Sequence, residues 1–304
     1  MYKKFKKISA ILCVASMLSC ISMTAFANNL DTQASETNPL DSGKEILYYL
    51  FWTQDDKLKS DLEDLQIEVG LSDHQMEELK DIGLNEHLEN MTLSNEYASN
   101  ARSSVVTFNN VVENNVTLRN TNISETLGEK EDMFRDWILE WWGDERAYRM
   151  NSAQTRADVG TVTNIWATQY VPNTSGAREV ALPDKYVKFA NLGWDDTYSN
   201  PPYTVDVYSP DNDITLSNIA VDEVGPWNEN DNYWDDDRRE FSDLDVGVPE
   251  AYAAYYDDYN GGKDEFGRTV LNPAGIDLST TAAKEIGFGT YESGFVEVTY
   301  DDLP

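Results

Sequence analysis

The chain contains very little cysteine. Its 304 residues include only Cys13 and Cys20, both near the beginning. Residues 1–27 have the three-part layout of a secretory signal: four early lysines, a mostly apolar stretch and small residues at positions 25 and 27. Cleavage after Ala27 would leave 277 residues without cysteine, which excludes disulfides, a thiol nucleophile and cysteine-ligated metals. Lipoprotein processing at Cys20 is the disfavoured alternative, because the apolar stretch continues past that residue.

Basic residues are also few. Without residues 1–27, 19 Lys and Arg stand against 55 Asp and Glu, a net charge of about −36. Such a chain is not attracted to nucleic acid or to an anionic membrane surface, and an anionic cell wall repels it unless divalent ions intervene. No later stretch approaches the roughly 20 apolar residues that a membrane-spanning helix needs. With 40% apolar residues the chain can still form a core, so we expect a folded, secreted protein.

Histidine is limited to His74 and His87. They lie 13 positions apart, which is not a metal-ligand spacing, and we interpret both as exposed helix residues. The sequence has neither a Gly-x-Ser-x-Gly nucleophile elbow nor a glycine-rich phosphate loop. The groups left for chemistry are mainly carboxylates.

Proline is almost absent from the first half. Between residues 28 and 171 it occurs only at Pro39, whereas nine of the ten prolines and 11 of the 17 glycines lie later. Because both residues are disfavoured inside helices, we predict a helical region over residues 28–160 and a strand-rich domain over 161–304.

Local patterns in the first half agree with helices. Leu58, Leu62 and Leu65 repeat at helical spacing, and Ser72 with Gln75 reads as a capping box. A stripe over residues 134–141 predicts a further helix that ends at Gly143, whose tryptophans at 137, 141 and 142 should pack the helices against the second half. Residues 92–125 are open to two interpretations, a helix or a mobile linker.

In the second half, alternating apolar residues predict strands over 186–189, 203–208, 219–221 and 296–300. Pro249 marks a helix start. A second helix is expected over 280–286, capped by Ser279 and stopped by Gly287.

Two carboxylates stand out by their context. Glu223 ends an apolar strand before a Gly-Pro break, and Asp277 lies between Ile276 and Leu278 directly before the predicted helix. A carboxyl group kept protonated by burial can perform acid catalysis on glycosidic bonds. The alternative for Asp277 is that it caps the helix.

Three segments together resemble the RlpA-like double-psi β-barrel family, which includes RlpA-type lytic transglycosylases and the barrel domain of expansins. They are Val221-Asp-Glu-Val-Gly-Pro-Trp227, Gly275-Ile-Asp-Leu-Ser279 with its helix to Gly287, and Gly294-Phe-Val-Glu-Val298. The resemblance spans roughly residues 180–300. It implies a six-stranded double-psi β-barrel with a large acidic insertion, and together with the helical N-terminal region predicted above this gives an α+β protein.

The resemblance also implies the site. The important acid of the family matches Asp277, and the acid of the earlier strand, usually Asp, matches Glu223. The family's early Gly-x-Ala-Thr-Tyr-type strand has only Ala167-Thr168-Gln169-Tyr170 as a weak counterpart. We expect the two carboxyl groups to lie within ~10 Å of each other in one groove, although they are 54 residues apart.

The long insertion, residues 228–272, separates the two motifs. Its aromatic and charged side chains could wall a glycan groove, or the tryptophans could anchor the insertion to the barrel. The expected substrate-binding residues are Trp227, Tyr233, Trp234, Arg238 and Arg239. We expect no cofactor, although oxygen-bearing side chains at positions 258, 260 and 264 leave a weak indication of a structural calcium ion.

Three functions remain open. The first is a secreted cell-wall glycan-acting protein with lytic transglycosylase-like cleavage of peptidoglycan. The second is a non-catalytic, expansin-like module that binds glycan or loosens the wall. The third is a secreted interaction scaffold, since a fold does not determine a function. The expected partner is peptidoglycan or another polysaccharide.

Overall fold

The computed structural model describes residues 38–52, 56–99, 104–153, 161–185, 204–235 and 238–300. These residues belong to one compact unit that runs from Thr37 to Pro304. The expected signal over residues 1–27 and the strand predicted over 186–189 lie outside the described residues.

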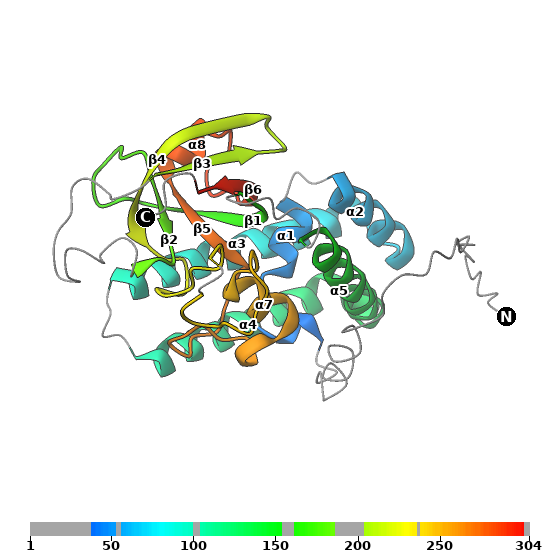
Figure 1. The fold of residues 1–304 in the computed structure, drawn as a ribbon. Coiled ribbons are helices and arrows are strands. Elements are labelled where there is room, and N and C mark those ends of the chain that lie inside the picture. Colours follow the sequence, from blue (N-terminus) through cyan, green and yellow to red (C-terminus); the bar gives the residue numbers. More distant parts are fainter. Residues whose placement is uncertain are drawn as a thin grey trace, which may run out of the picture. The chain divides into compact units, whose positions relative to one another are not determined.

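The first part of the described chain is helical, as predicted (Figure 1). Its elements are η1 (Pro39–Asp41), α1 (Ile46–Trp52), α2 (Asp56–Val69), α3 (Asp73–Ser99), α4 (Val105–Leu127), η2 (Gly128–Lys130) and α5 (Glu131–Ala153). The predicted capping box opens α3, because the Ser72 hydroxyl accepts from the Gln75 N–H and the Gln75 side chain accepts from the Ser72 N–H. Most of the ambiguous stretch 92–125 is helix, in α3 and α4.

The expected helix end at Gly143 is wrong. Helix α5 continues to Ala153, because side chains beyond the glycine are held by other elements. Glu145 is buried and accepts from the Lys57 ammonium at 2.6 Å, and Arg146 pairs with Asp257 at 3.0 Å. These contacts outweigh the roughly 1 kcal/mol by which glycine disfavours a helix interior.

The second part forms a closed six-stranded barrel with the strand order β1-β5-β2-β4-β3-β6. Its elements are β1 (Thr161–Tyr170), β2 (Glu179–Leu182), β3 (Thr204–Ser209), β4 (Ile214–Val224), α7 (Glu250–Asp257), η3 (Tyr259–Gly261), β5 (Ala274–Ser279), α8 (Thr280–Glu285) and β6 (Gly294–Thr299). The expected α+β arrangement of a helical region followed by a barrel is therefore confirmed. Strands β1, β2 and β5 were not among the strands predicted from alternation.

Two parallel strand pairs characterise the barrel. Strand β1 pairs in parallel with β5, and β2 pairs in parallel with β4, while the other neighbours are antiparallel. Helix α7 lies in the connection between β4 and β5. Helix α8 starts where expected, since the Ser279 hydroxyl accepts from the Ala282 N–H at 3.2 Å.

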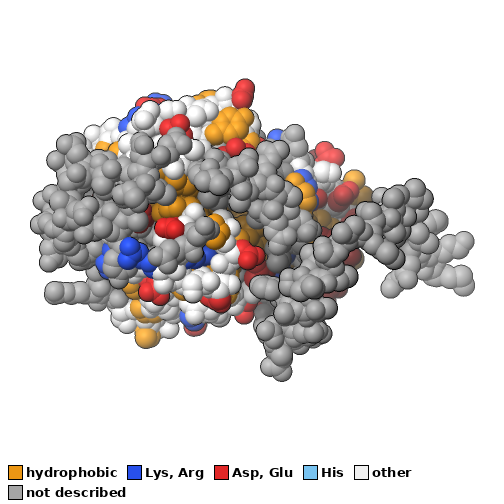
Figure 2. All heavy atoms as spheres, viewed as in Figure 1, with side chains coloured by type: hydrophobic (Ala, Val, Ile, Leu, Met, Phe, Trp, Pro, Cys, Tyr) orange, Lys and Arg blue, Asp and Glu red, His pale blue; other side chains and the backbone are white. Residues whose placement is uncertain are grey.

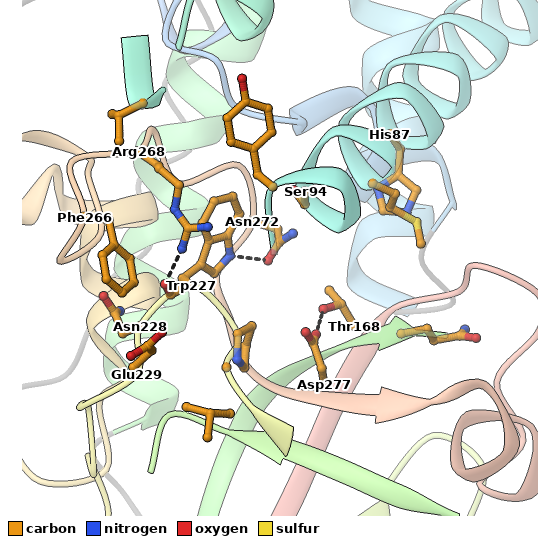
Figure 3. A pocket seen from close by; sticks show the side chains of 17 residues that line it. His87, Ser94, Thr168, Trp227, Asn228, Glu229, Phe266, Arg268, Asn272 and Asp277 are labelled. Atoms are coloured by element: carbon orange, nitrogen blue, oxygen red, sulfur yellow. Dashed lines mark hydrogen bonds between the residues drawn. The ribbon is translucent and has the colours of Figure 1, made fainter. Parts of the chain in front are cut away.

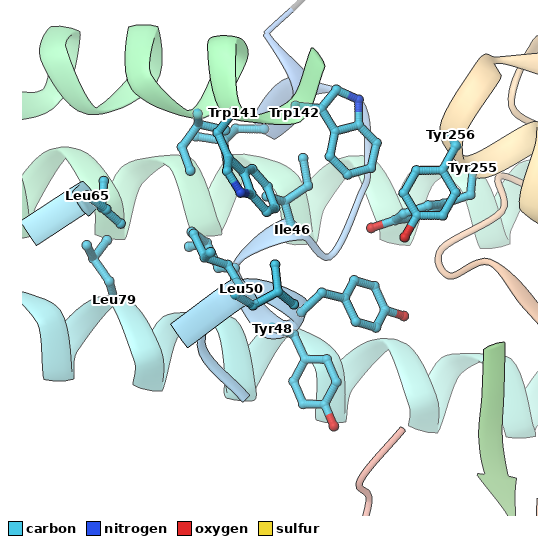
Figure 4. Close-up of a cluster of buried hydrophobic side chains, with 14 of the residues drawn as sticks. Ile46, Tyr48, Leu50, Leu65, Leu79, Trp141, Trp142, Tyr255 and Tyr256 are labelled. Carbon is cyan, nitrogen blue, oxygen red and sulfur yellow. The ribbon is translucent and has the colours of Figure 1, made fainter. Parts of the chain in front are cut away.

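The barrel interior is one apolar cluster, and a second cluster joins the helices to the barrel. Ile276, Leu278 and Val296 are among the fully buried residues inside the barrel. The second cluster unites α1, α2 and α5 with α7 (Figure 4). It also includes Trp166 and Ala274 of the barrel. The helical part and the barrel thus share a core.

The three tryptophans of α5 divide between two neighbours. The Trp142 ring stacks on Tyr256 of α7, with ring centroids 5.2 Å apart, so this residue packs the helices against the second half as expected. Trp137 and Trp141 instead donate their indole N–H groups to Glu68 and Asp61 of α2.

The surface agrees with the acidic composition. In Figure 2 acidic side chains are scattered over the visible face with a few basic ones between them. None of the described helices is both long enough and apolar enough to cross a membrane.

Candidate functional site

Asp277 lies in the middle of β5, not at the start of a helix. Its neighbours Ile276 and Leu278 are fully buried in the barrel core, so the alternation of the strand directs Asp277 to the outer face. The N-cap of α8 is Ser279. Helix capping therefore does not account for Asp277.

Thr168 of β1 is the direct neighbour of Asp277. The parallel pairing of β1 and β5 places the two residues in register, and the Thr168 hydroxyl donates to the Asp277 carboxylate. Burial raises the pKa of Asp277 to about 6, although the Thr168 hydrogen bond acts in the opposite direction. The weak sequence match at residues 167–170 therefore lies beside the candidate acid.

A cavity of about 390 Å³ opens over Asp277 and Thr168 (Figure 3). Its barrel side also includes Gln169, Val224 at the end of β4, and the following Gly225 and Pro226. Its helical side includes His87 and Ser94, which lie on one face of α3. The remaining wall comes from the connection between β4 and β5. The helices, for which the sequence suggested no role, thus form part of the site.

The wall from the β4–β5 connection combines aromatic, cationic and amide groups. The Trp227 indole N–H donates to the side chain of Asn272 at 3.0 Å. The guanidinium of Arg268 lies 5.7 Å from the Trp227 ring centroid and 5.1 Å from that of Phe266. The Nε atom of this guanidinium donates a hydrogen bond to the Asp264 carboxylate. Sugar rings and their hydroxyls are bound by side chains of these kinds.

Glu223 and Asp277 lie in one row of the barrel. Both are register partners of Ala181, which β2 places between β4 and β5. With strands about 4.8 Å apart, their Cα atoms are separated by roughly 10 Å. Glu223 is outside the described cavity lining and accepts from Asn173 at 2.9 Å.

Tyr170 links the two carboxylates electrostatically. Its hydroxyl donates to Glu179 at 3.0 Å. Burial is the main cause of the raised pKa of Tyr170, and the nearby negative charges of Glu179, Glu223 and Asp277 raise this pKa further. The two predicted acids therefore both raise the pKa of the same phenol. The expected distance between their carboxyl groups stays a prediction.

Other predicted binding residues are placed differently. Tyr233 is fully buried and its hydroxyl donates to the Gly275 carbonyl, while Trp234 stacks on Tyr300. The buried Arg238 is paired with Asp231. The exposed Arg239 has its N–H bonded to Asn232. Of the five expected binding residues, Trp227 alone is among the described residues that line the cavity. Tyr233 and Trp234 instead anchor the β4–β5 connection to the barrel.

The segment considered for calcium is engaged in protein contacts. The Asp264 carboxylate accepts from the backbone N–H groups of Phe266 and Arg268. The Asn260 amide donates to the Lys263 carbonyl. Within the described ranges no group of three or more His, Cys, Asp or Glu side chains is arranged to hold a metal.

The interpretation of His87 as an exposed residue is wrong. Only 1% of it is exposed, because its ring stacks on Tyr48 with centroids 3.5 Å apart. Its Nδ1 atom lies 2.7 Å from a carboxylate oxygen of Glu45. His74, on the same helix, is 78% exposed as expected. Helical spacing alone could not reveal that α1 covers one histidine.

Residues 150–299 match the sequence model of a family described as "Domain of unknown function (DUF8814)". The matched range takes in the whole barrel, from β1 to the end of β6. No curated protein and no solved structure matches the chain.

Proposed function

We propose that this protein acts on a cell-wall glycan and cleaves it in the manner of a lytic transglycosylase, with Asp277 as the acid. One observation carries the proposal. Asp277 is a carboxyl group with a pKa of about 6 on the floor of a 390 Å³ cavity. An acid with that pKa is substantially protonated in mildly acidic solution, as general acid catalysis requires.

The proposed barrel type is the double-psi barrel of the RlpA-like family. Three features support it: the closed six-stranded order, the two parallel strand pairs, and the position of Asp277 one strand from Thr168. In this proposal residues 228–272 are an acidic insertion into the barrel, and residues 1–27 direct secretion.

The proposed reaction needs one carboxyl group in two roles. Asp277 first donates its proton to the glycosidic oxygen as the bond from that oxygen to the anomeric carbon breaks. The resulting carboxylate then accepts the proton of a hydroxyl on the same sugar, whose oxygen forms the new bond to the anomeric carbon. The products are a shortened chain and an anhydro sugar, and no water is consumed.

The surrounding residues have supporting roles in this proposal. Trp227 offers an aromatic surface to a sugar ring, and Arg268 and Asn272 offer hydrogen bonds to its hydroxyls. Thr168 holds the Asp277 carboxyl in place. Glu223, one strand beyond Ala181, would hold a neighbouring part of the sugar chain.

The experiment is incubation of the chain without residues 1–27 with peptidoglycan and, separately, with cellulose. Mass spectrometry should detect anhydro-sugar products from peptidoglycan. Asp277→Asn, treated identically, is the matched control. Products that carry an added water instead would show hydrolysis and contradict the transglycosylase step.

The second candidate is an expansin-like module that binds glycan without cleaving it. The observation that favours it is the wall formed by Trp227, Phe266 and Arg268, which could bind a sugar whether or not Asp277 reacts. Co-sedimentation with insoluble glycan without any released product would favour this function. Absence of both binding and cleavage would favour the interaction scaffold.

A further inference from the structure

His87 is held rigidly at the helical side of the cavity. Its ring stacks on Tyr48 with an interplanar angle of 6°, and its Nδ1 atom is hydrogen-bonded to Glu45. Both His87 and Glu45 are 1% exposed. The ring therefore has neither freedom to rotate nor access to bulk solvent on its Nδ1 side.

The contact with Glu45 determines which ring nitrogen remains available. A carboxylate only accepts hydrogen bonds, so Nδ1 carries a proton and donates it to Glu45. In the neutral imidazole the Nε2 atom then holds a free lone pair. Among the described residues, none forms a hydrogen bond with this buried Nε2 atom. An unpartnered buried polar atom is uncommon and costly, so it calls for a partner from outside the chain.

The position of His87 indicates where that partner would bind. His87 lines the same cavity as Thr168 and Asp277. Figure 3 shows it projecting from α3, on the opposite side of the cavity from the strands that carry those two residues. A ligand that fills the cavity would therefore contact the imidazole on one side and the carboxyl group on the other.

We propose that His87 is a ligand-binding residue whose Nε2 atom accepts a hydrogen bond from a hydroxyl group of the sugar bound over Asp277. This inference rests on the proposed function for the chemical class of the ligand. Glu45 is a positioning residue, because it fixes the tautomer and the direction of the lone pair.

The test uses soluble tetramers of N-acetylglucosamine and of glucose, titrated into the chain without residues 1–27 by calorimetry. All variants carry Asp277→Asn, so that bound sugar is not cleaved. His87→Asn keeps a donor for Glu45 but removes the group at the Nε2 position, and it should weaken binding about 3- to 10-fold. His87→Gln, which restores a polar group near the Nε2 position, should recover part of the loss. His74→Asn on the exposed part of α3 is the matched control and should bind normally.

A second measurement needs no variant at His87. Because the chain has only two histidines, their ring ¹⁵N resonances can be assigned with His74→Asn. Addition of the tetramer should shift the Nε2 resonance of His87 and leave that of His74 in place.

Unchanged binding by His87→Asn, or an unchanged Nε2 resonance when the tetramer binds, would overturn the proposed role of His87 but not the proposed function. Binding that depends on His87 without cleavage by the unmutated chain would contradict only the transglycosylase step. If neither tetramer binds, the role of His87 is overturned, and the peptidoglycan cleavage assay decides the proposed function separately.

Discussion

At the scale of single residues, Asp277 combines a half-buried position with one hydrogen bond. Its pKa of about 6 implies that the protonated acid predominates below that value. If cleavage requires this proton, the rate should fall about tenfold per pH unit above pH ~6. Asp277→Asn should abolish cleavage at every pH with little loss of fold, since the side chain does not cap α8. Peptidoglycan digestion followed by mass spectrometry from pH 4 to 8 measures both effects, and full cleavage by the Asn variant would remove Asp277 from the mechanism.

The same pKa has a consequence for stability. The folded state raises the pKa of Asp277 from 3.8 to about 6, so between these values the folded chain binds more protons than the unfolded one. The stabilising contribution of this group is therefore complete below pH ~4 and is lost as the pH rises through 6. Relative to Asp277→Asn, the unmutated chain should lose up to about 3 kcal/mol of unfolding free energy over this interval. Urea titrations at pH 4 and pH 7 of both proteins measure the difference.

A substitution at Thr168 can change the pKa of Asp277 without replacing Asp277 itself. Its hydroxyl lowers the pKa of Asp277, because it donates to the charged form of the carboxyl group. Thr168→Val keeps the shape and removes this donor, so the pKa of Asp277 should rise. The alkaline limb of the rate profile should then move to higher pH. A profile that moves to lower pH would show that the hydrogen bond does not act on Asp277 as inferred.

At the scale of elements, Gly83 determines how closely α1 and α3 approach. A Cβ atom at this position would lie 2.8 Å from backbone atoms of Leu47 and Tyr48, which cannot rotate away. Gly83→Ala should lower the unfolding free energy by about 1–3 kcal/mol. Gly143→Ala in α5 is the control, because an added Cβ atom there would meet no atom of the described residues within 4 Å beyond its own helix backbone. It should raise the unfolding free energy by up to about 1 kcal/mol. Urea denaturation measures both, and a neutral effect at Gly83 would mean that the two helices can separate without cost.

The start of α8 depends on Ser279. Its hydroxyl caps the Ala282 N–H and donates to the Ala177 carbonyl beside β2. Ser279→Ala should therefore cost about 1–2 kcal/mol, which thermal unfolding can detect. Ser279→Thr, which keeps the hydroxyl, should retain more of the stability than Ser279→Ala. If Ser279→Ala unfolds at the temperature of the unmutated chain, the cap is not needed to hold the helix.

At the scale of the whole molecule, one core unites the helices and the barrel. Trp142 is central to this union through its contacts with Tyr255 and Tyr256 of α7. Trp142→Ala should lower the unfolding free energy by about 3–5 kcal/mol, whereas Trp137→Ala, which faces α2 and is partly exposed, should cost less. Calorimetry should show one cooperative transition for the unmutated chain. Two separate transitions would mean that the helical part and the barrel unfold independently.

Much of the architecture could be predicted from local patterns. The scarcity of proline and glycine before residue 171 indicated the helical part, because these residues are disfavoured in helices. The apolar neighbours Ile276 and Leu278 indicated that Asp277 would be partly buried, although the strand β5 that contains all three was not predicted. The hydroxyl and the spacing of Ser279 likewise indicated the start of α8.

Only the tertiary structure decided which distant residues meet. Thr168 contacts Asp277 across 109 positions because the closure of the barrel sets the register of β1 against β5, and no local pattern encodes that register. His87 and Tyr233 are buried because other elements cover them. The residues next to a histidine or tyrosine in the sequence do not reveal whether a distant element covers its side chain. The sequence by itself thus determined the two halves of the chain and the candidate acid, whereas packing decided the cavity over that acid and the residues that line it.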